Sequence, residues 1–421
     1  RQQYYDSGIK TCESNGVIIA ASLLANPNEG EPEYATTMCH PEYGGTSPYT
    51  MPNITDMNGI NAYAATIDYL ANRYSVKGQG RIHHWIMHNE VDQNKYWTDM
   101  GEGQPLLRFM EHYERSMRLV TNIVRQYDPN AYVLGSYTSA WTSTNGNGGF
   151  APKQMMDLMV SFSNIEGDFR WGIAYHPYPQ NFYKPAFWSA DTGATYAENS
   201  SFCTFKNMEV ISDWMLRPEH YYKGKEKRIL FFSENGVNSL QDTQSQLAVQ
   251  AAGAAWAWKK VVHNPGIDAV MWHNWFDNPS EDGLHLGLRD KDLNPKPVWY
   301  VWQAAGTDNE SSVLDQYLST IGISSWNQIY NAVAVVGNES QRFNPLLSTC
   351  TDATGSYDSN YQSYKFVTTG GDPQFQTEAC TSALSTNSNV LSFEYKLDKA
   401  VSDFQVFFSP MAEEVRSLVV S

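Results

Sequence analysis

The chain reads Ile229-Leu-Phe-Phe-Ser-Glu-Asn-Gly236 at the point that decides its fold. Four apolar residues in a row, rich in β-formers, are typical of a fully buried strand. The small residue, carboxylate, Asn and Gly that follow are typical of a strand running into a loop. A charge at the end of a buried strand is costly unless something uses it. Glu234 is therefore either held in a structural salt bridge or belongs to a functional site.

A second stretch has the same form and favours the functional interpretation. It reads Arg81-Ile-His-His-Trp-Ile-Met-His-Asn-Glu90, a strand-like apolar run that again ends on a glutamate. Two strand-terminal glutamates, 144 positions apart in the sequence, are what a retaining glycosidase needs.

Strand-like and helical stretches alternate through residue 305. Apolar segments favour six strands, at 17–24, 83–90, 132–139, 171–178, 228–236 and 269–277. Helical spacing favours helices at 3–15, 55–74, 105–127, 152–162, 207–216 and 243–263, and from residue 296 onward. Buried strands that alternate with helices indicate a parallel sheet covered by helices.

Two α/β architectures fit six such units. A doubly wound sheet usually carries a glycine-rich phosphate turn after its first strand, and the sequence has none there. In a (β/α)8 TIM barrel, functional residues gather at the C-terminal ends of many strands. The candidate residues fall at such ends: Glu90, His176, Tyr178, Glu234 and the Trp272/Trp275 pair. We therefore predict a catalytic (β/α)8 TIM barrel over residues 1–330. Two strands are missing, and because the chain opens on a helix we expect them to precede Arg1, in the remainder of a larger polypeptide.

The composition changes after about residue 330. Ser, Thr, Asn and Gly become frequent, and short alternating segments occur at 364–367, 390–396, 404–408 and 415–421. This pattern predicts a smaller antiparallel β-sandwich over residues 331–421. The segment ends on a strand-like run, so we expect this domain also to be incomplete. Cys350 and Cys380 lie 30 positions apart in it and could pair, and no cysteine or histidine spacing suggests zinc.

The bulk composition limits the kinds of partner. The 421 residues are 42% hydrophobic and carry a net charge of −16, spread along the chain. Nucleic acid and anionic membrane surfaces are therefore not expected as partners, because both need a basic patch. No apolar run approaches the roughly 18–20 residues of a membrane span. The 13 Trp and 26 Tyr suit the faces of sugars, although many will be core. We expect a secreted protein, or one at the cell surface or in the periplasm.

Five pieces of sequence occur in one order between Arg81 and Gly306. They are Asn89-Glu90, Tyr175-His-Pro-Tyr178, the Glu234 stretch, Trp272 or Trp275, and a tail from Gly283 to Tyr300 that holds Gly-Leu, a polar turn and Lys-Pro. In this order they resemble a clan A (4/7 superfamily) retaining glycoside hydrolase with a C-terminal β-sandwich. The resemblance implies that Glu90 is the acid/base and Glu234 the nucleophile. The clan's arginine on strand two has no match here, which follows from the missing first strands.

The chemistry of the residues agrees with these implied roles. Retention of configuration needs two carboxyls about 5 Å apart across the sugar bond. Glu234 must stay ionised, helped by hydrogen bonds from Tyr178 or His176, and its charge favours the protonated form of Glu90. Asn89 would hold the sugar 2-hydroxyl. Trp272 and Trp275 offer flat faces to a sugar ring, with core packing the expected role of at least one. No cofactor is expected.

Two other classes of function stay open. A carbohydrate-binding pseudo-enzyme would keep the glutamates only as hydrogen-bond acceptors. A metal-dependent hydrolase would use His83, His84 and His88, but on a strand His83 faces the opposite side from the other two, so the three do not converge simply. We predict no metal site. The sugar, the linkage, and endo or exo action depend on the loops 26–54, 140–150 and 178–206.

Overall fold

The computed structural model of the protein describes residues 2–28, 32–75, 79–144, 149–334, 345–358, 363–377, 404–408 and 416–420. The chain divides into two compact units, Arg1–Gly337 and Asn338–Ser421. In the part of the chain that the structure describes, no helix combines the length and apolar character that crossing a membrane requires.

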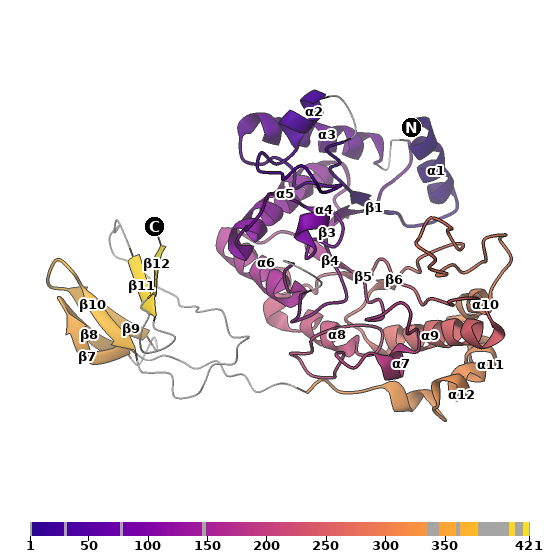
Figure 1. Ribbon diagram of the computed structural model, residues 1–421. Coiled ribbons are helices and arrows are strands. Elements are labelled where there is room, and N and C mark those ends of the chain that lie inside the picture. The colour runs from indigo at the N-terminus through magenta and orange to yellow at the C-terminus, as the bar shows by residue number, and fades with distance from the viewer. Residues whose placement is uncertain are drawn as a thin grey trace. The chain divides into compact units, whose positions relative to one another are not determined.

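Six parallel strands form one sheet in the first unit (Figure 1). They are β1 (Ala20–Leu23), β2 (His84–Met87), β3 (Tyr132–Tyr137), β4 (Trp171–Tyr175), β5 (Leu230–Phe232) and β6 (Ala269–Val270). Each strand pairs with the next one along the chain, so the order in the sheet is the order in the sequence. In a doubly wound sheet the order of the strands would reverse partway across the sheet. The sheet is therefore a TIM-barrel-like half-barrel, and the predicted fold class is confirmed.

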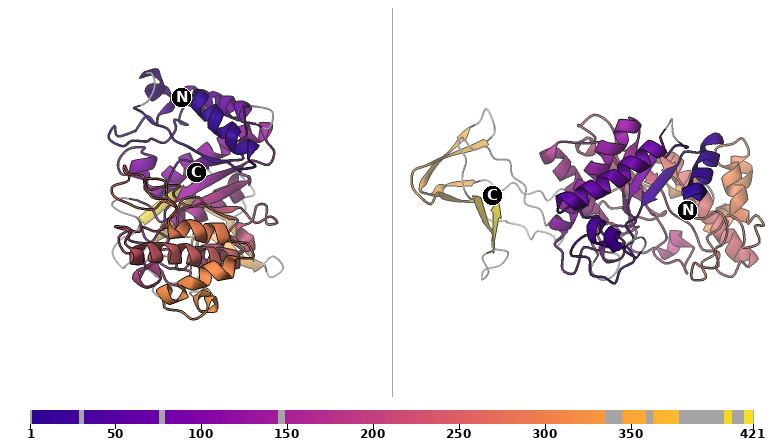
Figure 2. Two further views of the ribbon diagram at one scale, coloured as in Figure 1. Left: turned by 90° about the vertical axis from the view of Figure 1, so that its right-hand side faces the viewer. Right: turned by 90° about the horizontal axis from the view of Figure 1, so that it is seen from above.

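Helices connect the strands. The α-helices of the first unit are α1 (Gln2–Ser14), α2 (Pro32–Met38), α3 (Met57–Arg73), α4 (Asn94–Trp97), α5 (Leu106–Tyr127), α6 (Pro152–Glu166), α7 (Phe187–Ala190), α8 (Glu209–Met215), α9 (Gln244–His263), α10 (Pro297–Ala304), α11 (Glu310–Leu314) and α12 (Leu318–Ile321). Three short 3-10 helices cover Pro218–His220, Asp315–Tyr317 and Trp326–Ile329. Helix α3 packs on α5, α5 on α6 and α9 on α10, a succession that Figure 1 shows around the sheet and Figure 2 shows from two further directions.

Local sequence explains where the longest helices begin and end. The Asp56 carboxylate accepts hydrogen bonds from the backbone N–H groups of Asn58 (2.9 Å) and Gly59 (3.0 Å), which start α3. A capping box between Thr243 and Gln246 starts α9. Helix α5 ends at Tyr127, immediately before Asp128-Pro129, because the residue before a proline avoids helical geometry.

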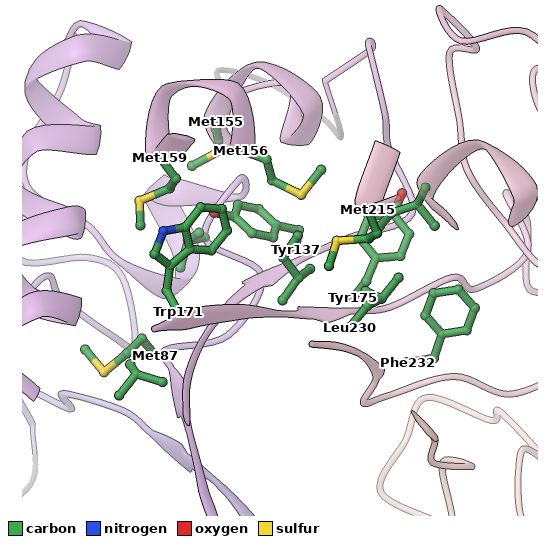
Figure 3. Packing of buried hydrophobic residues seen from close by; sticks show 14 of the residues in the cluster. Met87, Tyr137, Met155, Met156, Met159, Trp171, Tyr175, Met215, Leu230 and Phe232 are labelled. Carbon is green, nitrogen blue, oxygen red and sulfur yellow. The ribbon is translucent and has the colours of Figure 1, made fainter. Parts of the chain in front are cut away.

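The two faces of the sheet carry different side chains. The face away from the helices is a small apolar cluster of Ile86, Leu134, Ala174 and Phe231. The other face joins the main core, where aromatic rings of the strands meet methionines of the helices (Figure 3). We call five of the buried methionines of this core, those labelled in Figure 3, the methionine layer: Met87, Met155, Met156, Met159 and Met215. These two faces follow from the alternation of side chains along each strand.

The second unit contains small antiparallel sheets, as predicted. Strand β7 (Pro345–Thr351) pairs with β10 (Gln374–Thr377), β8 (Ala353–Asp358) with β9 (Ser363–Thr368), and β11 (Phe404–Phe408) with β12 (Arg416–Val420). Their arrangement as a sandwich stays a prediction. The expected strand at 390–396 and the Cys380 partner of Cys350 lie outside the described residues.

Candidate active site

Both candidate glutamates lie just beyond strand ends. Glu90 follows β2 by three residues and Glu234 follows β5 by two. The carboxyl ends of parallel strands meet at one edge of a sheet, so the two side chains share that edge although β3 and β4 separate their strands.

Glu90 is held from several directions. Its Oε1 accepts a hydrogen bond from His176 Nδ1 (3.0 Å) and its Oε2 accepts one from Gln93 Nε2 (2.9 Å). Its backbone N–H donates to Ser136 Oγ (3.0 Å). The backbone is left-handed here, with φ of +57° at His88 and +40° at Glu90, a conformation that costs an L-residue on the order of 1–2 kcal/mol. The turn that presents the carboxylate is therefore held by the contacts around it.

Glu234 is the more accessible of the two carboxylates. Its side chain is 36% exposed, against 16% for Glu90. The Tyr178 hydroxyl donates a hydrogen bond to Glu234 Oε1 (3.0 Å). Tyr178 therefore orients a side chain that solvent can still reach.

His176 lies between the two glutamates. Its Nδ1 is 3.0 Å from Glu90 Oε1 and 4.0 Å from Glu234 Oε2. The two distances add to 7.0 Å, which is the upper limit on the separation of those oxygens. Burial would lower the pKa of His176, but the hydrogen bond to Glu90 and the charges of Glu234 and Glu90 raise it overall. The ring therefore bonds Glu90 directly and lies within ion-pair distance of Glu234.

A third acid, Asp92, supports the site from below the surface. It is fully buried, and it accepts hydrogen bonds from the backbone N–H and the hydroxyl of Thr138. Burial raises its pKa to about 7, partly offset by these bonds. Sequence reasoning missed Asp92, Gln93 and Ser136. For Gln93 the only signal was its place three residues after Glu90.

The other predicted site residues lie in several environments. Asn89 is half-buried in the turn that leads to Glu90. Trp272 faces the helices, packs against Phe205 and Trp302, and donates its indole N–H to the Leu286 carbonyl. This is the packing role expected for one tryptophan of the pair. Trp275 is 59% exposed and contacts Trp299 edge-on.

The three histidines of the 81–90 stretch do not form a cluster of ligands. His83 Nδ1 accepts the backbone N–H of Ile19, and His84 packs edge-on against Phe231 in the small apolar cluster. His88 is buried beside Tyr113. Burial lowers the pKa of both His84 and His88 to about 4, so their rings are neutral near pH 7.

Within the described ranges, another group has metal-like geometry: Asp242, Asp277 and His285. The Lys296 ammonium lies 3.0 Å from Asp277 Oδ2 and 3.5 Å from Asp242 Oδ1. It also donates to Ser239 Oγ (2.8 Å). The ammonium therefore supplies positive charge to these carboxylates, and the group forms a partly buried ion-pair network.

Comparison with solved structures finds distant similarity to glycoside hydrolases. A family 39 glycoside hydrolase from the gut symbiont Bacteroides cellulosilyticus WH2 has a TM-score of 0.49 at 16% identity, over 74% of this chain and 54% of that one. Xylanase 10B from Thermotoga maritima has a TM-score of 0.46 at 16% identity, over 75% of this chain and 80% of that one. Xylanase 10C from Cellvibrio japonicus has a TM-score of 0.45 at 13% identity, over 77% of this chain and 60% of that one. The chain thus spans about half the length of the first of these proteins.

Sequence comparison gives a family but no characterised relative. A search of the curated proteins finds no match. Residues 2–329 match the model of a family of unknown function, DUF5722. The match takes in every strand of the parallel sheet and both candidate glutamates. The chain belongs to this family, DUF5722.

Proposed function

We propose that the protein is a retaining glycoside hydrolase that cleaves β-glycosidic bonds in a polysaccharide or oligosaccharide, outside the cytoplasm. The observation that carries the proposal is the pair of strand-end glutamates bridged by His176. Their facing oxygens are at most 7.0 Å apart. Retaining enzymes hold their carboxyls about 5–5.5 Å apart, a spacing that this limit allows.

In the first step, a Glu234 oxygen attacks the anomeric carbon while the bond to the leaving-group oxygen breaks. Glu90 donates its proton to that oxygen, and the products are a glycosyl ester on Glu234 and a free alcohol. In the second step, Glu90 takes a proton from water, the water oxygen attacks the same carbon, and Glu234 leaves as a carboxylate. The two inversions give net retention.

The neighbours of the glutamates have separate tasks in these steps. Tyr178 donates to the attacking carboxylate and keeps it oriented. His176 and Gln93 hold the two oxygens of Glu90, so that the proton is exchanged at a fixed position. Asn89, next to Glu90, would bind the sugar 2-hydroxyl.

The experiment compares the wild type with Glu234→Ala and Glu90→Ala on a panel of β-linked polysaccharides and on 2,4-dinitrophenyl β-glycosides. We expect each variant to lose at least about 10³-fold in kcat on the polysaccharides. Added azide should rescue both on the activated glycosides with opposite stereochemistry. Glu90→Ala should give the β-glycosyl azide through the ester, and Glu234→Ala the α-glycosyl azide by direct displacement.

The control variant is Glu226→Gln, a carboxylate near the other end of β5 that pairs with Arg170. It should keep wild-type activity. Wild-type rates in both alanine variants would show that the strand-end glutamates are structural. Sugar binding without turnover by the wild type would indicate the pseudo-enzyme instead.

A further inference from the structure

Three aromatic side chains form a small surface close to Glu90. Tyr49 stacks on Trp97 with ring centroids 5.0 Å apart and planes 16° apart, and Tyr96 meets Trp97 edge-on at 4.8 Å. Tyr96 is 51% exposed, and Tyr49 and Trp97 are half-buried. We call Tyr49, Tyr96 and Trp97 the aromatic patch.

The aromatic patch is linked to Glu90 through Gln93. The Gln93 amide donates to Glu90 Oε2 (2.9 Å), and the Gln93 carbonyl accepts the backbone N–H groups of Tyr96 (2.9 Å) and Trp97 (3.2 Å). Only one turn of α4 therefore separates the two aromatic residues from the side chain that holds Glu90. Four residues of helix rise about 6 Å, roughly the size of one sugar ring.

Strand order places the aromatic patch on one side of the site. Tyr49 lies in the segment after β1, and Tyr96 and Trp97 lie in the segment after β2. Glu234 follows β5, on the far side of β3 and β4. The aromatic patch is thus beside Glu90 and away from Glu234. Because Glu90 protonates the leaving group in the proposed reaction, this is the side from which the leaving group departs.

The aromatic patch is held in place by Asp99. The Asp99 backbone N–H donates to the Tyr49 carbonyl (3.2 Å), and the Asp99 carbonyl accepts from Met51 N–H (3.1 Å) and the Thr50 hydroxyl (3.0 Å). The buried Asp99 carboxylate accepts the backbone N–H of Gly101 (2.8 Å). A surface that is ordered before binding loses little entropy when a ligand arrives.

Helix α4 offers no unpaired cation beside the aromatic patch. Its one charged side chain, Lys95, pairs with Glu102 at 2.7 Å. The surface therefore offers ring faces without a free positive charge, which suits the C–H faces of a neutral sugar better than an anionic one.

We infer that the aromatic patch binds the leaving-group sugar of a neutral β-linked oligosaccharide, and this inference rests on the proposed function. The test uses Tyr96→Ala and Trp97→Ala, with Tyr300→Ala on α10 as control, since Tyr300 is 50% exposed and matches Tyr96. Each enzyme is assayed on two substrates of one sugar. The first is whichever of cello-, xylo-, manno- and laminaritetraose the wild type hydrolyses, and the second is the corresponding β-glycosyl fluoride, whose leaving group places no sugar beside Glu90.

Each variant of the aromatic patch should lose about three- to tenfold in kcat/KM on the tetrasaccharide. Activity on the fluoride should stay within about twofold, and Tyr300→Ala should match the wild type on both. Thermal unfolding of each variant checks that the fold is intact, and the exposed Tyr96 keeps the test valid if Trp97→Ala unfolds.

If the variants of the aromatic patch keep the wild-type rate on the tetrasaccharide, or lose activity equally on both substrates, the patch does not bind the leaving-group sugar. Either result leaves the proposed function in place. A wild type that hydrolyses neither the fluoride nor any tetrasaccharide would overturn both. The loss confined to the tetrasaccharide is the result that supports the inference.

Discussion

At the scale of single residues, Asp92 makes the stability of the protein depend on pH. Its pKa rises from 3.8 to about 7 because it is buried, with Glu90 adding to the effect. The folded state therefore binds the proton more tightly than the unfolded state, and stability falls as pH rises from about 4 to about 7. Asp92→Asn removes this titration while keeping a partner for Thr138. At pH 8 the variant should be more stable than the wild type, by up to about 4 kcal/mol.

Urea unfolding at pH 4, 6 and 8 measures this effect. The difference between Asp92→Asn and the wild type should grow across the series. The exposed Asp308→Asn is the control and should show a constant difference. A constant difference for Asp92→Asn as well would mean that Asp92 is charged in the fold throughout.

At the same scale, the side chains that contact the glutamates divide into those with and those without a sequence signal. His176 and Tyr178 belong to a short motif after a strand, and both contact a glutamate. Gln93 and Ser136 contact Glu90 at a turn where the backbone is left-handed at His88 and Glu90, and no sequence pattern marks that turn. Trp272 was open to prediction, because it shares the helix-facing parity of Val270. The catalytic roles themselves stay predictions.

Close packing between strands gives a prediction at the scale of elements. A Cβ on Gly172 in β4 would lie 2.8 Å from the Ile229 carbonyl oxygen and 2.8 Å from Leu134 Cδ2. Gly172→Ala should therefore destabilise the fold by about 1–3 kcal/mol. Gly8 in α1 has nothing within 4 Å of a built Cβ, so Gly8→Ala should stabilise it by about 0.5–1 kcal/mol. The denaturant midpoint of each variant measures the effect. It should fall below that of the wild type for Gly172→Ala and rise above it for Gly8→Ala, and shifts of the same sign would contradict the prediction.

The elements were predicted better in kind than in extent. All six strands occur, but the segments expected at 228–236 and 269–277 are ladder strands only at Leu230–Phe232 and Ala269–Val270. The reason is a side chain. The Asn235 amide donates to the carbonyls of Phe232 (3.0 Å) and Met271 (2.8 Å), which ends the backbone pairing early. The segments 26–54 and 178–206, which were predicted as loops, contain the short helices α2 and α7. These helices were missed because their hydrophobic periodicity is weak.

The whole molecule consists of two units whose independence can be tested. The buried members of the main core run from Met51 to Ile329, all within the first unit. A chain ending at Gly337 should therefore fold alone, with an unfolding temperature and activity close to those of the full chain. A chain ending at Gly306 lacks the buried Leu314, Ile321 and Ile329 and should be much less stable. Similar behaviour of the two shortened chains would contradict this division.

The methionine layer has a consequence for the protein's chemical lifetime. Its five thioethers are at most 1% exposed, whereas Met57 at the start of α3 is 65% exposed. Peroxide converts methionine to a polar sulfoxide, and a sulfoxide inside the core would disrupt it. Since oxidants reach Met57 first, mild oxidation modifies the surface and spares the interior. The methionine layer can be oxidised only when the fold opens. The rate at which the protein is inactivated in an oxidising environment is therefore set by how often it unfolds.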